Sequence, residues 1–123
     1  MRLRRSVALG AVLAVLVPSS SLASVDYPER LLITAEEWDL ALSRTKLDPG
    51  DAIIELHNRG EDAHDVKIKR RGRRHVVSIP ETGSGATTRI EATLRKDSRY
   101  VLWCSLEGHR GLGMEAELRT AKN

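Results

Sequence analysis

Hydrophobic and polar residues alternate along much of the chain from residue 24 onward. Ala52, Ile54 and Leu56 would lie on one face of a strand, with Glu55 and His57 on the other. A period of two residues is typical of a β-strand with one buried face. The same alternation recurs in Val66–Lys69, Tyr100–Cys104 and Glu115–Arg119. These segments therefore predict strands that cover a core on one side.

Turn-forming residues separate the alternating runs at short intervals, as in Asp48–Asp51 and Pro80–Gly83. The segment 35–42 has some helical propensity, but β-like runs flank it. The strands expected from this spacing are Arg30–Ala35, Trp38–Ser43, Ala52–Asn58, Ala63–Lys69, His75–Ile79, Thr87–Thr93, Arg99–Cys104 and Met114–Thr120. Many short strands with regular turns predict an all-β fold, a single sandwich of about seven to eight strands.

The N-terminus has the pattern of a secretory signal peptide. A basic start, Met1–Arg5, precedes an apolar run of 11 residues from Val7 to Val17, and small residues follow up to Ala23. This run is shorter than the roughly 20 residues of a spanning helix. We expect cleavage after Ala23, a domain over residues 24–123 and export to the periplasm or another extracytoplasmic space. An uncleaved leader, which would leave the protein associated with the membrane, is the alternative.

The charge balance changes once this leader is considered. The whole chain has 20 basic and 17 acidic residues, a net charge of +3. Three of the basic residues and no acid lie in the leader, so 17 of each remain and the predicted domain is neutral. A nucleic-acid partner is therefore not expected. The basic cluster in residues 67–74 is either a solvated hairpin or a surface that steers an acidic partner or contacts an anionic membrane.

One cysteine is present, Cys104, which excludes an internal disulfide and a zinc ribbon. His109 and Met114 follow it at intervals of five residues in a glycine-rich stretch that predicts a tight loop. A thiolate, an imidazole and a thioether suit a soft or borderline transition metal, and a second histidine would complete a blue-copper site. His64, at the start of an expected strand, is the best candidate. As alternatives, Cys104 and Met114 could simply be buried hydrophobic side chains.

These residues resemble the cupredoxins, the type I or blue copper proteins. The resemblance lies in Asp48–Gly60, His64–Asp65 and Tyr100–Met114. It implies a Greek-key β-sandwich with one copper ion at one end, held by His64, Cys104, His109 and Met114. It also implies one-electron transfer between larger redox proteins, through the exposed edge of the His109 ring. The loop length is nearest to auracyanin- and rusticyanin-like members.

Three departures from the family pattern affect the surroundings of the predicted site. Asp65 stands where many members have asparagine, Glu107 stands where many have proline, and Lys96–Arg99 replaces the usual Pro-Gly turn. We expect Asp65 to hydrogen-bond near the ligand loop. Trp103, next to Cys104, either packs against a neighbouring segment or lies near the electron route. We expect His57 and His75 to be surface residues.

The sequence thus predicts an exported, monomeric copper protein that is not an enzyme, with an unidentified redox donor and acceptor. The alternative is a copper-handling protein (a chaperone, buffer or sensor) that does not shuttle electrons. The lack of methionine- and histidine-rich runs counts against it. A binuclear copper site would need a second cysteine, and a multicopper oxidase would need further histidine clusters. A Cys–His hydrolase does not fit the all-β pattern with Met114.

Overall fold

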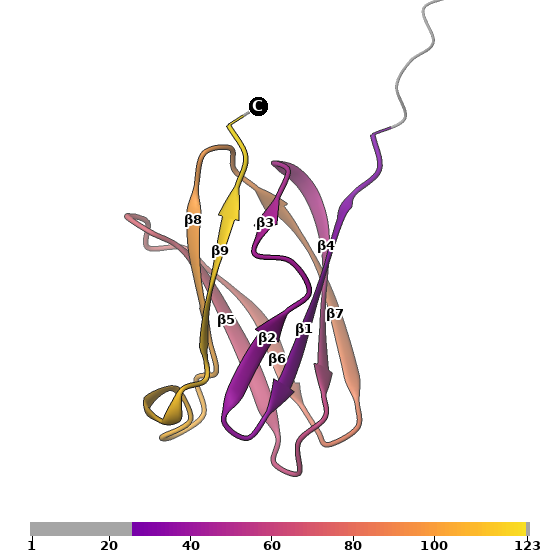
Figure 1. Cartoon of the computed structure of the whole chain (residues 1–123), viewed down its shortest axis with the longest axis vertical. Helices are drawn as coiled ribbons and strands as arrows, with labels where there is room; N and C mark the ends of the chain where they lie inside the picture. The colour runs from indigo at the N-terminus through magenta and orange to yellow at the C-terminus, as the bar shows by residue number, and fades with distance from the viewer. Residues whose placement is uncertain (1–25, 123) are drawn as a thin grey trace, which may run out of the picture.

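Two β-sheets face each other in the computed structural model, which describes residues 26–122 (Figure 1). One sheet has the strand order β2-β1-β4-β7, and the other has the order β3-β9-β8-β5-β6. The strands are β1 (Glu29–Glu36), β2 (Asp39–Leu42), β3 (Lys46–Leu47), β4 (Gly50–Asn58), β5 (His64–Arg70), β6 (Val76–Thr82), β7 (Thr87–Leu94), β8 (Arg99–Trp103) and β9 (Glu115–Thr120). A single-turn 3-10 helix, η1 (Arg110–Leu112), precedes β9.

The two sheets are mainly antiparallel, with one parallel pair in each. In the first sheet β1 pairs in parallel with β4, from Glu29 opposite Ala52 to Ala35 opposite Asn58. In the second sheet β3 pairs in parallel with β9. Parallel neighbours need connections that leave the sheet and return, so the chain passes repeatedly from one sheet to the other.

The core lies between the sheets, where the alternating hydrophobic residues meet. Ala52, Ile54 and Leu56 of β4 are all buried, as their period predicts. Tyr100, Leu102 and Cys104 are buried on the inner side of the second sheet. Val101 and Trp103, which alternate with them, are only partly buried. The predicted inward and outward faces of these strands are therefore confirmed.

All eight predicted strands occur, with ends shifted by three residues or fewer. The strand count differs, because the described residues form nine strands rather than seven or eight. The additional strand is β3, whose two residues pair with Arg119 and Thr120 of β9. The segment 35–42 has some helical propensity but is not helical. It forms the end of β1, a turn at Glu37 and Trp38, and β2.

One end of the sandwich holds the turns that matter for the site. β1, β4 and β8 end there, and β5 and β9 begin there (Figure 1). The described part of the chain contains no helix long and apolar enough to cross a membrane. The predicted leader and its cleavage site lie outside the described residues.

Candidate metal centre

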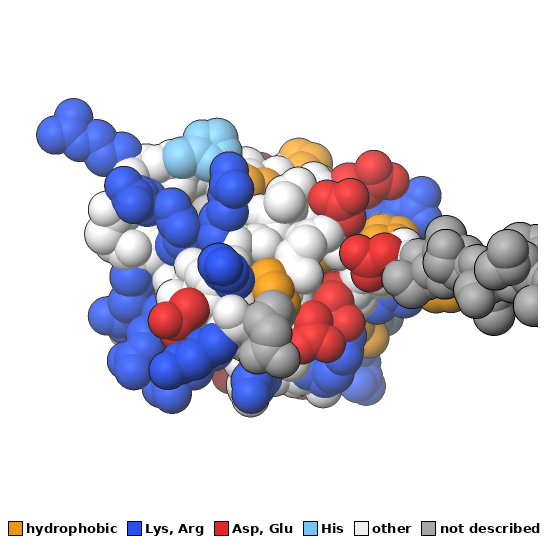
Figure 2. Space-filling model, turned by 90° about the horizontal axis from the view of Figure 1, so that it is seen from above, with side chains coloured by type: hydrophobic (Ala, Val, Ile, Leu, Met, Phe, Trp, Pro, Cys, Tyr) orange, Lys and Arg blue, Asp and Glu red, His pale blue; other side chains and the backbone are white. Residues whose placement is uncertain are grey.

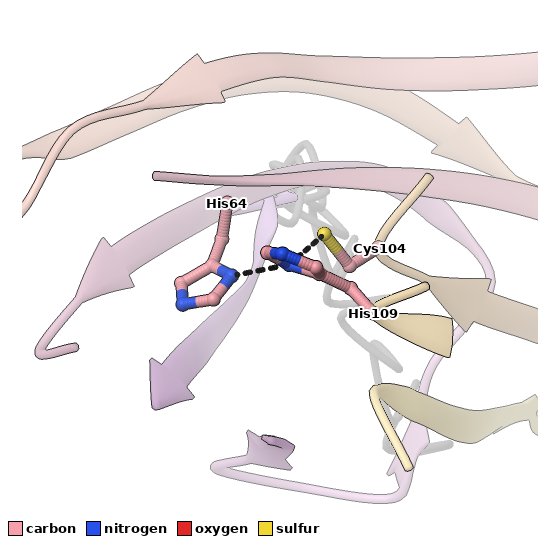
Figure 3. A group of neighbouring side chains, drawn as sticks. All are labelled: His64, Cys104 and His109. Carbon is pink, nitrogen blue, oxygen red and sulfur yellow. Dashed lines mark hydrogen bonds between the residues drawn. The ribbon is translucent and has the colours of Figure 1, made fainter. Parts of the chain in front are cut away.

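Three side chains that could bind a metal converge at this end of the sandwich: His64, Cys104 and His109 (Figure 3). Their donor atoms all lie within 4.8 Å of one another. The Nδ1 atoms of the two histidines are 3.3 Å apart, and the Cys104 Sγ is 3.5 Å from the His109 Nδ1. His64 and Cys104 are fully buried, whereas His109 is partly buried.

Strand ends and a tight loop bring these residues together. His64 begins β5, and Cys104 directly follows β8, which pairs with β5. The chain then turns back, and the His109 amide donates a hydrogen bond to the Leu106 carbonyl at 3.1 Å. Gly108 and Gly113 have φ values of 79° and 123°, which glycine adopts without steric cost. The glycine-rich loop therefore folds His109 over Cys104, as the sequence predicted.

Met114 lies at the end of the same loop and is fully buried. Its amide donates to the His109 carbonyl at 3.3 Å, and its carbonyl accepts from the Cys104 amide at 3.1 Å. Backbone hydrogen bonds thus connect Met114 to Cys104 and His109, two of the three residues of the His64–Cys104–His109 cluster. A thioether ligand from Met114 is the fourth, proposed member of the site.

The spacing and chemistry of the donors fit one transition-metal ion. Two donors that each lie about 2.0–2.3 Å from a common ion in an open angle are roughly 3–4 Å apart. His109 Nδ1 is at such a distance from both His64 Nδ1 and Cys104 Sγ. Burial raises the pKa of the Cys104 thiol, so without metal the thiol keeps its proton at neutral pH. A metal ion that binds there must displace this proton. The set of one thiol and two imidazoles fits copper or zinc. A buried methionine whose backbone is hydrogen-bonded to Cys104 and His109 favours copper, because a thioether is a soft ligand.

No protein-family model matches the sequence, and no curated protein matches it. Solved structures do match the fold. Auracyanin from Roseiflexus castenholzii, in its dithionite-reduced form, is 15% identical, with a TM-score of 0.64 over 78% of this chain and 99% of that chain. The chain has the cupredoxin fold.

Two further matches agree with this assignment. Auracyanin A from Chloroflexus aurantiacus, described as a "blue" copper protein, is 17% identical, with a TM-score of 0.63 over 76% of this chain and 99% of that chain. A multicopper oxidase is 9% identical, with a TM-score of 0.57 over 76% of this chain and 44% of the oxidase. The resemblance to cupredoxins inferred from the sequence is therefore confirmed at the level of the fold.

Asp65 connects β5 to the loop between β8 and β9, residues 104–114, which is called the ligand loop below. Its carboxylate accepts hydrogen bonds from the Ser105 amide, at 2.6 Å, and from the Ser105 hydroxyl. Burial alone would raise the pKa of Asp65, but the hydrogen bonds from Ser105 outweigh it and hold that pKa below its usual range. The carboxylate therefore stays ionised and fixes the residue that follows Cys104.

Glu37, in the turn between β1 and β2, contacts the cluster and was not expected from the sequence. Its Oε1 lies 3.0 Å from the Nε2 of His64 and accepts the Asp62 amide at 2.8 Å. The Asp62 hydrogen bond is the main reason that the pKa of Glu37 falls to about 2. No local pattern indicates this contact, because the turn meets His64 only once the two sheets have formed.

Trp38, the next residue of the turn, contacts the other histidine. Its ring lies 4.8 Å from the ring of His109, centroid to centroid, with planes at 71°. This edge-to-face geometry is favourable for aromatic rings. The sequence placed Trp38 in a strand and gave no sign of this contact, which forms between residues 71 positions apart.

Trp103 lies on the outer face of the second sheet rather than in the cluster. The guanidinium of Arg110 lies over its ring, 4.7 Å from the centroid, and also pairs with Glu115. Trp103 and Arg110 are therefore in contact. In the sequence, Trp103 is next to Cys104 and Arg110 is next to His109.

The other two histidines and most of the basic cluster lie away from these ligands. His57 hydrogen-bonds to Thr87 on the outer face of β4, and His75 is exposed before β6. Arg70–Arg74 form the end of β5 and the turn toward β6, at the opposite end of the sandwich. Figure 2 looks onto that opposite end, where most of the Lys and Arg side chains lie on one side and most of the acidic side chains on the other.

Proposed function

We propose that this protein is an exported, mononuclear type I copper protein that carries single electrons between larger redox proteins. The observation that supports this most directly is the convergence of His64, Cys104 and His109 at one end of a cupredoxin fold. Met114 completes the proposed ligand set from the end of the same loop. Two histidines, one cysteine and a weak axial methionine are the ligands of blue-copper electron-transfer sites.

Each ligand has a defined task in this proposal. Cys104 binds as thiolate, and His64 and His109 bind as neutral imidazoles through the Nδ1 atoms that face the cluster. When bound, the copper ion supplies a one-electron couple. The buried strand ends and the hydrogen-bonded loop hold the donor atoms in place, so little rearrangement accompanies a change of oxidation state. Small rearrangement favours fast electron transfer.

The surface around His109 suits brief contact with another protein. His109 is partly buried, Leu112 is 58% exposed, and Trp38, which packs on His109, is 38% exposed. Redox encounter complexes use small interfaces, so a few exposed apolar side chains suffice. We propose that the donor and the acceptor dock here, and that electrons pass through the His109 ring.

The predicted leader supports an extracytoplasmic location for this exchange. A free, unpaired cysteine is liable to oxidation in an exported protein unless something protects it. Full burial and copper ligation of Cys104 would both provide that protection.

Voltammetry of the copper-loaded protein tests the electron-carrier role against copper handling. A carrier gives a fast, reversible one-electron wave that the Cys104→Ser variant lacks. His75→Ala, which changes an exposed histidine far from the cluster, leaves the wave unchanged and serves as the control. A copper-loaded protein with no reversible wave would instead be a chaperone, buffer or sensor.

A further inference from the structure

The carboxylate of Glu37 occupies a position beside the cluster that the ligand set alone does not explain. It lies 3.0 Å from the Nε2 of His64. Figure 3 shows that this ring nitrogen points away from Cys104 and His109. An ionised carboxylate can only accept hydrogen bonds, so the Nε2 of His64 must carry the hydrogen. The Nδ1 of a neutral His64 ring then has a free lone pair, directed at the cluster.

The surrounding turn is built to hold Glu37 in this position. The Asp62 amide donates to the same Oε1 at 2.8 Å. The buried Asn58 organises that turn, since its side-chain amide donates to the carbonyls of Asp62 and Thr82 and its oxygen accepts the Gly60 amide. A Cβ atom on Gly60 would overlap the Glu37 carboxylate. Glycine at position 60 therefore leaves the space that the carboxylate fills.

We propose that Glu37 is a positioning residue of the metal site. Its carboxylate fixes the tautomer and ring orientation of His64, and the absence of a side chain at Gly60 leaves room for that carboxylate. A carboxylate behind a ligating imidazole also makes the imidazole a stronger donor. The negative charge favours the more positive, oxidised state of a bound copper ion and so lowers the reduction potential. The effect on the metal depends on the proposed function, whereas the effect on the tautomer does not.

The tautomer of His64 in the metal-free protein is the direct test. At about pH 8, where free imidazole is neutral, two-dimensional 15N–1H NMR distinguishes an Nε2–H ring from an Nδ1–H ring. We expect the Nε2–H form in the wild type and a mixture of tautomers in Glu37→Ala. Gly60→Ala, which displaces the carboxylate without removing it, shifts the mixture in the same direction. An Nδ1–H ring in the wild type, or an unchanged ring in both variants, would overturn the proposal.

The metal-loaded protein provides the second readout. Glu37→Gln keeps a hydrogen-bond acceptor but removes the charge, so we expect a higher reduction potential and metal affinity reduced by about 10- to 100-fold. Glu36→Gln removes the same charge from the adjacent exposed residue and is the matched control, with little change expected. Equal shifts in both variants would mean that Glu37 acts only through its general charge. A wild-type protein that binds no copper would refute the proposed function, while the NMR test would still decide the role of Glu37.

Discussion

The indole ring of Trp38 packs edge-to-face against the imidazole of His109, with ring centroids 4.8 Å apart. Because Glu37 contacts His64, the short turn between β1 and β2 touches both histidines of the cluster. The first sheet thus contributes to a site whose proposed ligands all come from the second sheet and its loops. Because of these two contacts, substitutions in the turn should change the properties of the proposed site.

Trp38→Leu should speed the loss of copper to a chelator. An aromatic pair of this geometry contributes about 0.5–1.5 kcal/mol, so we expect a rate increase of about 2- to 10-fold. Stopped-flow absorption in excess chelator measures this rate. Trp103→Leu, which changes a tryptophan that contacts Arg110 instead of a ligand, serves as the control. If the two variants lose copper equally fast, the contact with His109 does not protect the site.

Gly113→Ala should destabilise the ligand loop. Gly113 has a φ of 123°, and a Cβ there would lie 3.1 Å from the Trp38 carbonyl oxygen. Holding a residue with a side chain in such a sparsely populated backbone conformation costs about 1–3 kcal/mol. Urea denaturation of the metal-free protein measures the loss. Gly111→Ala, in the same loop with open space around it and no positive φ, should change stability by less than about 1 kcal/mol. Equal effects at the two positions would contradict the described loop geometry.

Asp65→Ala should destabilise the protein by about 1–2 kcal/mol, because it removes the acceptor for both hydrogen bonds from Ser105. Ser105→Ala removes only the hydroxyl donor and should cost about half as much. Urea denaturation of the metal-free variants checks both values. Full stability in Asp65→Ala would show that this pair does not anchor the start of the loop.

Acid should weaken metal binding. Burial raises the pKa of the Cys104 thiol, so the thiol is protonated below that value and a metal ion must displace the proton. The apparent affinity for a probe ion such as Co²⁺ should therefore rise with pH, by about tenfold per unit from this one proton. Titrations at several pH values measure the slope. An affinity that does not change with pH would mean that no thiolate binds the metal.

The sequence predicted the fold well where local pattern and tertiary packing agree. In β4, Ala52, Ile54 and Leu56 alternate regularly, and all three are buried. The two-residue strand β3 was missed. Two residues, Lys46 and Leu47, are too few to show an alternating pattern, and they form a strand only because they pair with β9. A strand of this kind follows from contacts between distant segments, which no local window contains.

The part of the site that lies close together in the sequence was predictable, and the part that depends on sheet packing was not. Cys104, His109 and Met114 lie on one short loop, so their spacing in the sequence reflects their proximity in space. His64 was placed with them because it begins a strand, and β5 indeed lies beside β8. Glu37 and Trp38 could not be predicted, since they meet the histidines across 27 and 71 positions of sequence. Their roles depend on how the two sheets pack.

The visible absorption spectrum of the Cu(II)-loaded protein tests the central claim most directly. Binding by the Cys104 thiolate predicts an intense thiolate-to-copper band. Cys104→Ser should lose the band, and circular dichroism should show that this variant keeps its β-sheet fold. A copper-loaded wild type without an intense band, or a band that persists in Cys104→Ser, would contradict the assignment of a type I copper site.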